Sequence, residues 1–336
     1  MAESTAGARG GPGATLSVQE LRVLVAAAGA APSLHNTQPW QFRAADDGHG
    51  VLVFADPQRA VPLADPEGRG LMLSVGAALF NLRVAAARQG LPVEELELLP
   101  GPVEADSPVA VVHFGPRGVP DETAELADVI ALRHSSREPF NNRDVPEAVI
   151  GELIAAAAAE DTALDALEEA EARRVLALIT EAEAQIVADA ARLAETGSWL
   201  RGEPAADGIP VAALGPQDHE ARVPMRDFTG RGPAGSQRFE ALPQLLTIST
   251  RGDTAADWLR AGQAMERVWL VATANGLRVS VLHQAVELPE TRWRLRNPES
   301  GVGTVQVVLR VGYGPPGAAT PRREVDELLH GPAPAS

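Results

Sequence analysis

Cysteine and lysine are both absent from the 336-residue chain. Without cysteine there can be no disulfide, no thiolate nucleophile and no Cys-ligated zinc or iron-sulfur cluster. Without lysine, Schiff-base aldolases, pyridoxal-phosphate enzymes and lysine-dependent P-loop ATPases are excluded, and all 29 basic residues are arginine. Any redox chemistry would therefore need an external cofactor.

Basic charge is scarce as well, with 29 arginines against 45 acidic residues and a formal net charge of -16. Nucleic acid and anionic membranes are bound through clustered basic charge, so neither is expected as a main partner. We find no run of about 18 apolar residues that would predict a membrane span. Residues 1–15 lack the apolar stretch of a signal peptide, so we expect a cytoplasmic protein. Residues 1–15 and 331–336 are rich in Gly, Ala, Pro and Ser and are predicted to be disordered.

Several catalytic fingerprints are missing too. No strand pattern is followed by GxGxxG or a Walker loop, and no GxSxG elbow supports a hydrolase. The histidines show no metal-ligand spacing such as HExxH, so no metal site is predicted.

The order of helical and strand patterns can be followed along the whole chain. Ser17 with Glu20 forms a capping-box pattern, and Asp65-Pro66 and Asp144-Pro146-Glu147 are typical of helix starts. We predict helices over 17–29, 65–87, 121–133, 147–159 and 254–274, one or two helices over 163–200 and a short helix after 323; strands are predicted over 40–43, 51–55, 95–99, 109–114, 245–249, 279–282 and 305–313.

Two segments of the chain resemble earlier ones. Leu24–Ala28 is echoed by Leu153–Ala157, and the Gly76-x-Ala78 helix recurs around Gly262-x-Ala264. Small residues at matched places predict two long helices that pack closely. Chance similarity between Ala-rich helices is the alternative. The second pair of similar segments is separated by more residues than the first pair, so a true duplication would carry an insertion in its second copy. The Gly- and Pro-rich segment Gly202–Pro243 fits such an insertion, and its length is typical of a lid.

The first candidate site is the turn Pro32-Ser33-Leu34-His35-Asn36-Thr37-Gln38-Pro39-Trp40. Its hydroxyl, amide and imidazole groups on a proline-stiffened turn suit hydrogen bonding to a planar polar ring. A rigid helix-to-strand connection is the structural alternative.

Two further candidates are rich in arginine: Arg133-His134-Ser135-Ser136-Arg137 and Pro321-Arg322-Arg323. Forked guanidinium donors beside a hydroxyl can bind a phosphate. A basic helix C-terminus and a solvated arginine pair are the respective alternatives.

Together these motifs resemble the nitroreductase family of flavin mononucleotide (FMN) oxidoreductases. In that family an Arg-x-Ser-x-Arg/Lys segment precedes the first helix and a Pro-Ser-x-x-Asn-x-Gln-Pro-Trp turn follows it. Here the turn occurs only in the first half and the arginine segment only in the second. This order is similar to Acg-type nitroreductases, single chains whose two halves imitate the family homodimer.

The resemblance implies an α+β fold with two tandem degenerate halves and one complete flavin site. The halves would span 16–132 and 133–330, with the lid at 202–243 in the second. The resemblance implies that the FMN phosphate is held by Arg133, Ser135, Arg137, Arg322 and Arg323, with His134 nearby. The flavin ring would be faced by Ser33, His35 and Asn36. The hydrogen-bond donors near flavin N5 would lie at His283 and Gln284.

The activity implied is hydride transfer from NAD(P)H through flavin N5 to a nitroaromatic compound or quinone. No side chain is assigned as an obligatory acid or base. A flavin-sequestering protein with an occluded pocket, or a flavin-dependent tailoring oxidase, are the alternatives. A monomeric pseudo-dimer with a small-molecule substrate is expected, with further dimerisation left open.

Overall fold

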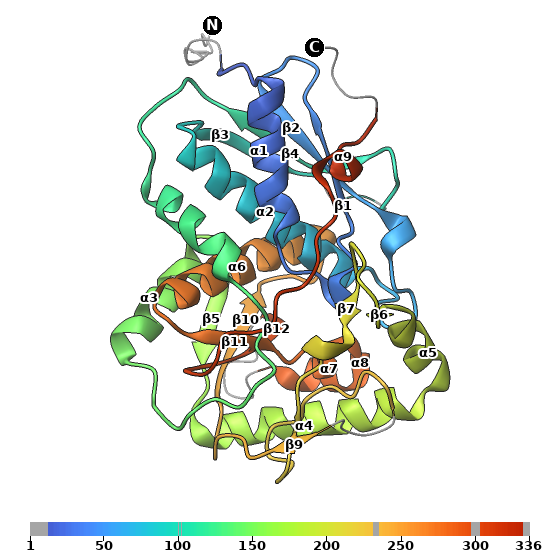
Figure 1. Cartoon of the computed structure of the whole chain (residues 1–336). Coiled ribbons are helices and arrows are strands. Elements are labelled where there is room, and N and C mark those ends of the chain that lie inside the picture. The colour runs from blue at the N-terminus through green and yellow to red at the C-terminus, as the bar shows by residue number, and fades with distance from the viewer. Residues whose placement is uncertain (1–12, 100, 102, 231–234, 297–302, 332–336) are drawn as a thin grey trace, which may run out of the picture.

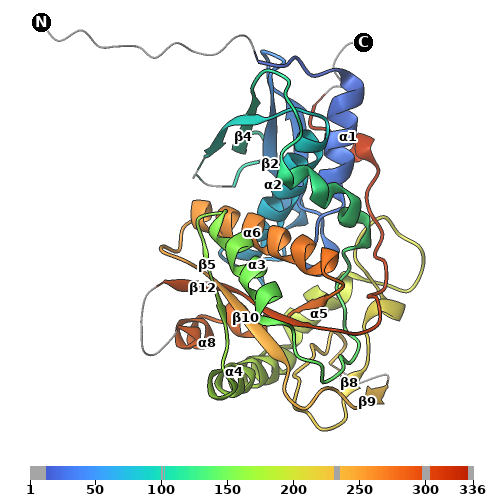
Figure 2. The same cartoon turned by 90° about the vertical axis from the view of Figure 1, so that its left-hand side faces the viewer.

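The computed structural model describes residues 13–99, 101, 103–230, 235–296 and 303–331. Most of the two predicted disordered ends, at 1–12 and 332–336, lies outside these residues. The described chain mixes helices with antiparallel sheets, which confirms the α+β fold class. Two sheets are separated by the long helices α2 (Arg69–Arg88) and α6 (Ala255–Ala274), as Figures 1 and 2 show.

The first half follows the predicted order closely. Helix α1 begins with the capping box that Ser17 and Glu20 form, as the sequence predicts. Besides α2, the elements of this half are α1 (Val18–Gly29), η1 (Leu34–Asn36), β1 (Trp40–Ala44), β2 (Gly50–Ala55), η2 (Pro57–Arg59), β3 (Val93–Leu98), β4 (Pro108–Phe114) and the 3-10 helix η3 (Glu122–Leu132).

The second half repeats this order around one large insertion, residues 167–243. Besides α6, its elements are α3 (Glu147–Ala158), β5 (Ala163–Ala166), β10 (Gln244–Thr250), β11 (Arg278–Val281), α7 (Gln284–Glu287), α8 (Pro289–Arg292), η5 (Trp293–Leu295) and β12 (Thr304–Gly312). The insertion contains α4 (Glu169–Ala188), α5 (Ala190–Ser198), β6 (Leu200–Arg201), β7 (Ile209–Pro210), η4 (Val211–Ala213), β8 (Gln217–Asp218) and β9 (Ser236–Gln237).

Sheet topology supports the internal repeat. The first sheet has the order β1-β2-β4-β3, and the second has the order β5-β10-β12-β11, with every neighbouring pair antiparallel. Each strand of one sheet thus has a counterpart at the same place in the other. The insertion lies between β5 and β10, where the first half has only the short turn that joins β1 to β2.

Helices α2 and α6 cross at two glycines, Gly76 and Gly262, whose Cα atoms approach closely. A methyl group on Gly76 would lie 2.2 Å from the carbonyl oxygen of Leu259, and one on Gly262 would lie 2.1 Å from that of Leu73. Only glycine permits this contact between the two backbones. The close packing predicted from the matched small residues is therefore confirmed.

Three local predictions were wrong. Helix α2 begins at Arg69, and Asp65 accepts a hydrogen bond from the amide of Leu71 instead of capping a helix at Pro66. Residues Ala163–Ala166 form strand β5 and not a helix, because they pair with β10 at the edge of the second sheet. Asp144 does not cap α3, whose N-cap is Pro146.

The C-terminal segment also corrects the predicted boundary of the second half. After β12 the chain returns to the first half, where α9 (Val325–Leu328) lies beside α1 (Figure 2). Leu329 bridges to Phe42, and the amide of His330 donates to the carbonyl oxygen of Phe42. Residues near 330 thus belong structurally to the first half.

By length and composition alone, helix α2 is apolar enough to cross a membrane, whereas the sequence analysis predicted no membrane span. Within the fold, 94% of its apolar window is buried. It packs against α6, α1 and η3 as a central core helix.

Candidate functional site

The predicted polar turn joins α1 to β1 in a strained conformation. His35, Asn36 and Gln38 have positive φ angles of 50°, 55° and 52°, which are uncommon for residues other than glycine. Hydrogen bonds hold the strained turn: the amide of Leu34 donates to Ser74 Oγ at 3.1 Å, and the amide of Gln38 donates to Ser33 Oγ at 2.9 Å. Clustered strain of this kind is typical of functional sites.

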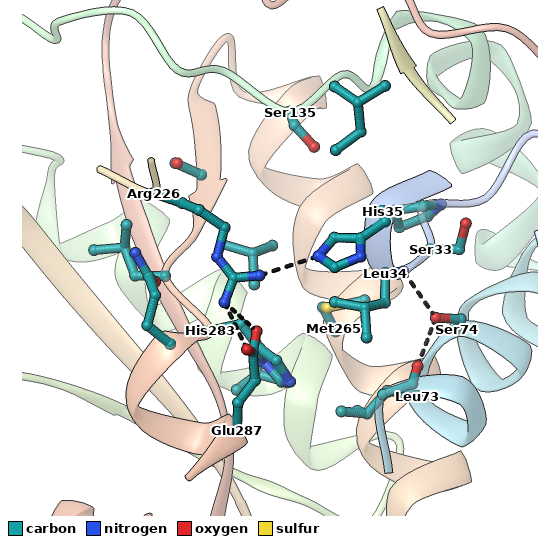
Figure 3. Close-up of a pocket in the computed structure, with 18 of the residues that line it drawn as sticks. Ser33, Leu34, His35, Leu73, Ser74, Ser135, Arg226, Met265, His283 and Glu287 are labelled. Carbon is teal, nitrogen blue, oxygen red and sulfur yellow. Dashed lines mark hydrogen bonds and ion pairs between the residues drawn. The ribbon is translucent and has the colours of Figure 1, made fainter. Parts of the chain in front are cut away.

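A cavity opens between the halves beside this turn (Figure 3). Its walls come from both halves and from the insertion, although these segments are far apart in sequence. The residues that line the cavity are Pro32, Ser33, Leu34, His35, Gly70, Leu73, Ser74, Ser135, Arg137, Ile209, Met225, Arg226, Phe228, Met265, Trp269, Ser280, Val281, Leu282, His283, Gln284, Glu287 and Val307. A largely apolar hollow with a few converging polar groups is typical of a ligand site.

Two arginines bring positive charge into the cavity. Arg137 donates to the carbonyl oxygen of Ala213 at 3.0 Å and lies over the ring of Phe228. Burial, together with the nearby charge of Arg226, lowers the pKa of Arg137 to about 10. Arg226 forms a two-pronged ion pair with Glu287, at 2.6 Å to each oxygen, and lies 3.1 Å from His35 Nε2. Within the described part of the chain, a carboxylate thus contacts and neutralises Arg226 but not Arg137.

The two histidines of the cavity are neutral at physiological pH. Burial, followed by the charges of Arg226 and Arg137, lowers the pKa of His35 to about 3. Burial and the charge of Arg226 likewise lower the pKa of His283 to about 4. Both rings are therefore available as neutral hydrogen-bonding groups.

A second group of predicted residues, Arg133, His134 and Arg322, forms what we term the cationic cluster. Arg133 Nη2 and Arg322 Nη2 donate to the same acceptor, the carbonyl oxygen of Ala30, at 3.2 and 3.0 Å. Burial, then the charge of Arg133, lowers the pKa of Arg322 to about 9. Burial and the charges of both arginines lower the pKa of His134.

The cationic cluster adjoins the cavity through Trp269, because Arg133 lies 4.7 Å from the centre of that ring. Glu266, 3.2 Å from Arg133 Nε, provides the nearest negative charge, but burial raises the pKa of Glu266 to about 7. The Nε of Arg322 and the Nδ1 of His134 are buried without a hydrogen-bond partner among the described residues. The cluster is therefore a place where an anion would be stabilised.

The structure thus sorts the predicted site residues into three sets. Those that line the cavity are Ser33, His35, Ser135, Arg137, His283 and Gln284. Arg133, His134 and Arg322 form the cationic cluster, and Asn36 joins it because Asn36 Oδ1 accepts from Arg322 at 3.1 Å. Arg323 lies apart, where its guanidinium donates to the carbonyl oxygens of Gln38 and Glu327.

Sequence analysis missed the cavity residues Arg226, Phe228 and Glu287. The first two lie in the predicted lid, Gly202–Pro243, in which the sequence analysis named no candidate site residue. Four residues of this segment line the cavity, and Gly208 donates to the carbonyl oxygen of Asn36 at 3.1 Å. Residues 231–234 of the lid lie outside the described part. The lid sequence contains four arginines, and no local pattern distinguishes Arg226 from the other three.

Comparisons with known proteins point to one family. The Nitroreductase family model matches residues 130–287. A Mycobacterium tuberculosis protein named "Putative NAD(P)H nitroreductase Rv3131" is 32% identical over 325 residues, which cover 94% of this chain and 92% of that protein. Another, named "Putative NAD(P)H nitroreductase acg", is 31% identical over 331 residues, which cover 95% of this chain and 98% of that protein.

Among solved structures, a Bacteroides fragilis nitroreductase with bound FMN is 17% identical, with a TM-score of 0.37. That match covers 59% of this chain and 93% of the other. The two M. tuberculosis relatives share nearly a third of their residues with this chain over almost their entire lengths. On that evidence, the chain belongs to the nitroreductase family.

Proposed function

We propose that the chain binds one FMN between its halves and uses NAD(P)H to reduce an electron-poor acceptor such as a nitroaromatic compound or a quinone. The observation that carries this proposal is the meeting of the polar turn with the arginine segment. Ser33 and His35 line the same cavity as Ser135 and Arg137, although the two motifs lie in different halves of the chain. Family membership and the NAD(P)H in the relatives' names support the same reading.

The residues present fit a flavin nucleotide. The apolar walls, among them Met265 and Val307, suit a planar ring, and the hydroxyl and imidazole groups suit its polar edge. The cationic cluster beside the cavity suits a phosphate, because Arg133 and Arg322 share one acceptor and Arg322 retains an unpartnered buried N–H among the described residues.

Each set of residues then has a separate task. The cationic cluster would hold the phosphate. Ser135 and Arg137, for which the resemblance implies a phosphate contact, line the cavity and would instead orient the ring together with Ser33. The insertion would exclude water through Met225 and Phe228, which strengthens the electrostatic interactions in the cavity. When bound, FMN supplies the redox chemistry, and the protein supplies position and environment.

Contacts between the insertion and the first half favour a second candidate, a protein that sequesters flavin. Gln38 Nε2 donates to the carbonyl oxygen of Ala206 at 2.9 Å, and Arg59 pairs with Asp207 at 3.0 Å. These bonds tie the insertion over the cavity. A cover held in this way would retain bound flavin while limiting access by a second substrate.

Anaerobic mixing of the purified protein with NADPH separates the two candidates. If the chain is an enzyme, the flavin absorbance will bleach within the time of one turnover and return when 1,4-benzoquinone is added. If flavin is present but neither NADPH nor NADH bleaches it, the reductase proposal fails and the result favours sequestration over NAD(P)H-dependent reduction. A chain that purifies without FMN and does not bind it on titration contradicts both.

A further inference from the structure

His35 makes an unusual contact with an arginine. Arg226 Nη1 lies 3.1 Å from His35 Nε2, and Figure 3 shows the guanidinium between the His35 ring and the Glu287 carboxylate. A guanidinium has only N–H donors, so it cannot accept a hydrogen bond. His35 Nε2 must therefore be the acceptor in this contact. In a neutral imidazole, the single proton then lies on Nδ1.

The position of Arg226 is fixed independently of any ligand. Glu287 accepts from Arg226 Nη2 at 2.6 Å through both of its oxygens, and Glu287 is itself buried. Burial lowers the pKa of Arg226, but the charges of Glu287 and of Glu183 in α4 outweigh this effect, so the pKa is raised. Arg226 is thus a permanent, oriented donor, which the insertion brings to the turn of the first half.

The other nitrogen of His35 lacks a partner. His35 is 5% exposed, and its Nδ1 is buried without a hydrogen bond to any described residue. The ring lines the cavity, with Phe228 packed edge-on against it at 6.2 Å between centroids. A buried N–H without an acceptor costs free energy, so a donor in this position is explained by a ligand that supplies the acceptor.

We infer that Arg226, oriented by Glu287, holds His35 in the Nδ1–H form so that His35 donates a hydrogen bond to an oxygen of the ligand in the cavity. The ligand chemistry is a carbonyl or nitro oxygen on a planar ring. Such an oxygen could belong to FMN or to the electron-poor acceptor. Arg226 acts through His35 and is a positioning residue; the inference rests on the proposed function for the identity of these ligands.

The first test reads the tautomer directly. Nitrogen-15 NMR of the imidazole rings in the purified protein should show His35 protonated at Nδ1 and unprotonated at Nε2, with assignment by His35→Asn. Removing Arg226 alone would leave Glu287 buried and unpaired, so the variant is Arg226→Met combined with Glu287→Gln. It should lose the Nδ1–H pattern, whereas Arg222→Met should keep it, because Arg222 pairs with Glu220 elsewhere in the insertion.

A His35 signal that is protonated at Nε2 in the unaltered protein, or one that does not change in the paired variant, overturns the inference. This measurement needs no flavin turnover. If the protein does not bind FMN, the proposed function is wrong, but the tautomer of His35 is still decided by the NMR measurement alone.

The second test identifies the ligand oxygen by affinity. His35→Asn is compatible with the positive φ of this position, because asparagine tolerates the left-handed region. If the acceptor oxygen is on the flavin, FMN binding to the flavin-free protein should weaken about tenfold. If the acceptor oxygen is on the substrate, FMN binding should stay within threefold of its original affinity. The binding of 1,4-benzoquinone to the FMN-loaded protein should then weaken about tenfold.

A double-mutant cycle separates positioning from direct contact. If Arg226 acts through His35, then His35→Asn added to the Arg226→Met/Glu287→Gln pair should weaken ligand binding no further than His35→Asn alone. Fully additive losses would mean that Arg226 contacts the ligand independently and would overturn the positioning role. Unchanged affinity for both FMN and 1,4-benzoquinone in His35→Asn would overturn the donor role.

Discussion

At the scale of single residues, the arginines of this chain divide by their surroundings. Arg322 is partly buried next to Arg133 and shares the carbonyl of Ala30 with it, whereas Arg323 reaches backbone oxygens outside the cluster. Since there is no lysine, every phosphate contact from a permanent cation must come from an arginine. The placement of Arg322 and Arg323 therefore predicts different consequences for two adjacent residues.

We expect Arg322→Ala to weaken FMN binding about tenfold or more, because one charge-assisted hydrogen bond contributes about 1.5 to 3 kcal/mol. Riboflavin has no phosphate, so its dissociation constant should change less than threefold. Fluorescence titration of both ligands measures this difference. Arg323→Ala is the matched control and should leave both constants within threefold. Equal losses for FMN and riboflavin in Arg322→Ala would show that Arg322 only supports the fold.

The two cavity histidines predict how stability depends on pH. His35 and His283 are neutral in the folded chain, but both bind a proton in the unfolded chain below its ordinary pKa of about 6.5. As pH falls from about 6.5 toward 4, the unfolded state gains protons that the folded state does not, so the free energy of unfolding must fall. At pH 5 this amounts to about 2 kcal/mol for each histidine.

Urea unfolding at pH 7 and pH 5 tests this prediction. Between pH 7 and pH 5, the free energy of unfolding of the double variant His35→Asn/His283→Asn should fall by about 4 kcal/mol less than that of the unaltered chain. If both proteins lose the same free energy, the two rings are not held neutral in the fold.

At the scale of secondary-structure elements, the contact between α2 and α6 joins the two halves. It is the place where an added methyl group would meet the carbonyl oxygens of the facing helix, at Gly76 and at Gly262. Helix α3 offers a contrast, because an added methyl at Gly151 would meet nothing within 4 Å.

Gly76→Ala and Gly262→Ala should each lower the free energy of unfolding by about 1 to 3 kcal/mol or more, because the rigid helices must separate to admit the methyl group. Gly151→Ala should be neutral or stabilise by up to about 1 kcal/mol, since alanine is the better helix former. Thermal and urea unfolding of the three variants decide this. A Gly76→Ala variant as stable as Gly151→Ala would contradict the close helix contact.

At the scale of the whole molecule, the two halves are alike in topology but not in their sites. Aligning Gly76 with Gly262 places Arg83 at the position of Trp269 in the cavity wall. Aligning Leu24 with Leu153 places Glu160 at the position of Ala31, directly before the turn. Arg83 pairs with Glu160 at 2.5 Å, and Arg267 pairs with Glu160 at 3.0 Å. An ion-pair cluster thus occupies the place where a second flavin site would be.

We therefore expect one FMN per chain, and a monomer that can bind it, because both motifs of the site come from the same chain. Absorbance of the bound flavin against protein concentration gives the stoichiometry, and light scattering gives the mass. Two equivalent flavins per chain, or flavin binding confined to a dimer, would contradict the single pseudo-dimeric site.

Local signals determined much of the fold. The capping box at Ser17 and Glu20 and the alternating patterns of the strands depend on nearby residues, so they could be predicted from the sequence. Strand β5 could not, because its short Ala-Leu-Asp-Ala segment is extended only through pairing with β10. The motif residues were identifiable for the same reason as the capping box, since each motif is contiguous in the chain.

By itself, the sequence determined the family resemblance, the internal repeat and the absence of thiol or lysine chemistry, because these depend on which residues are present and in what order. Only the tertiary structure decided which of those residues meet. The fold brings Arg226 from the insertion to His35 in the turn, and it sends Arg322 from beyond β12 to Arg133. Contacts across such separations depend on the packing of the halves, which no local pattern encodes.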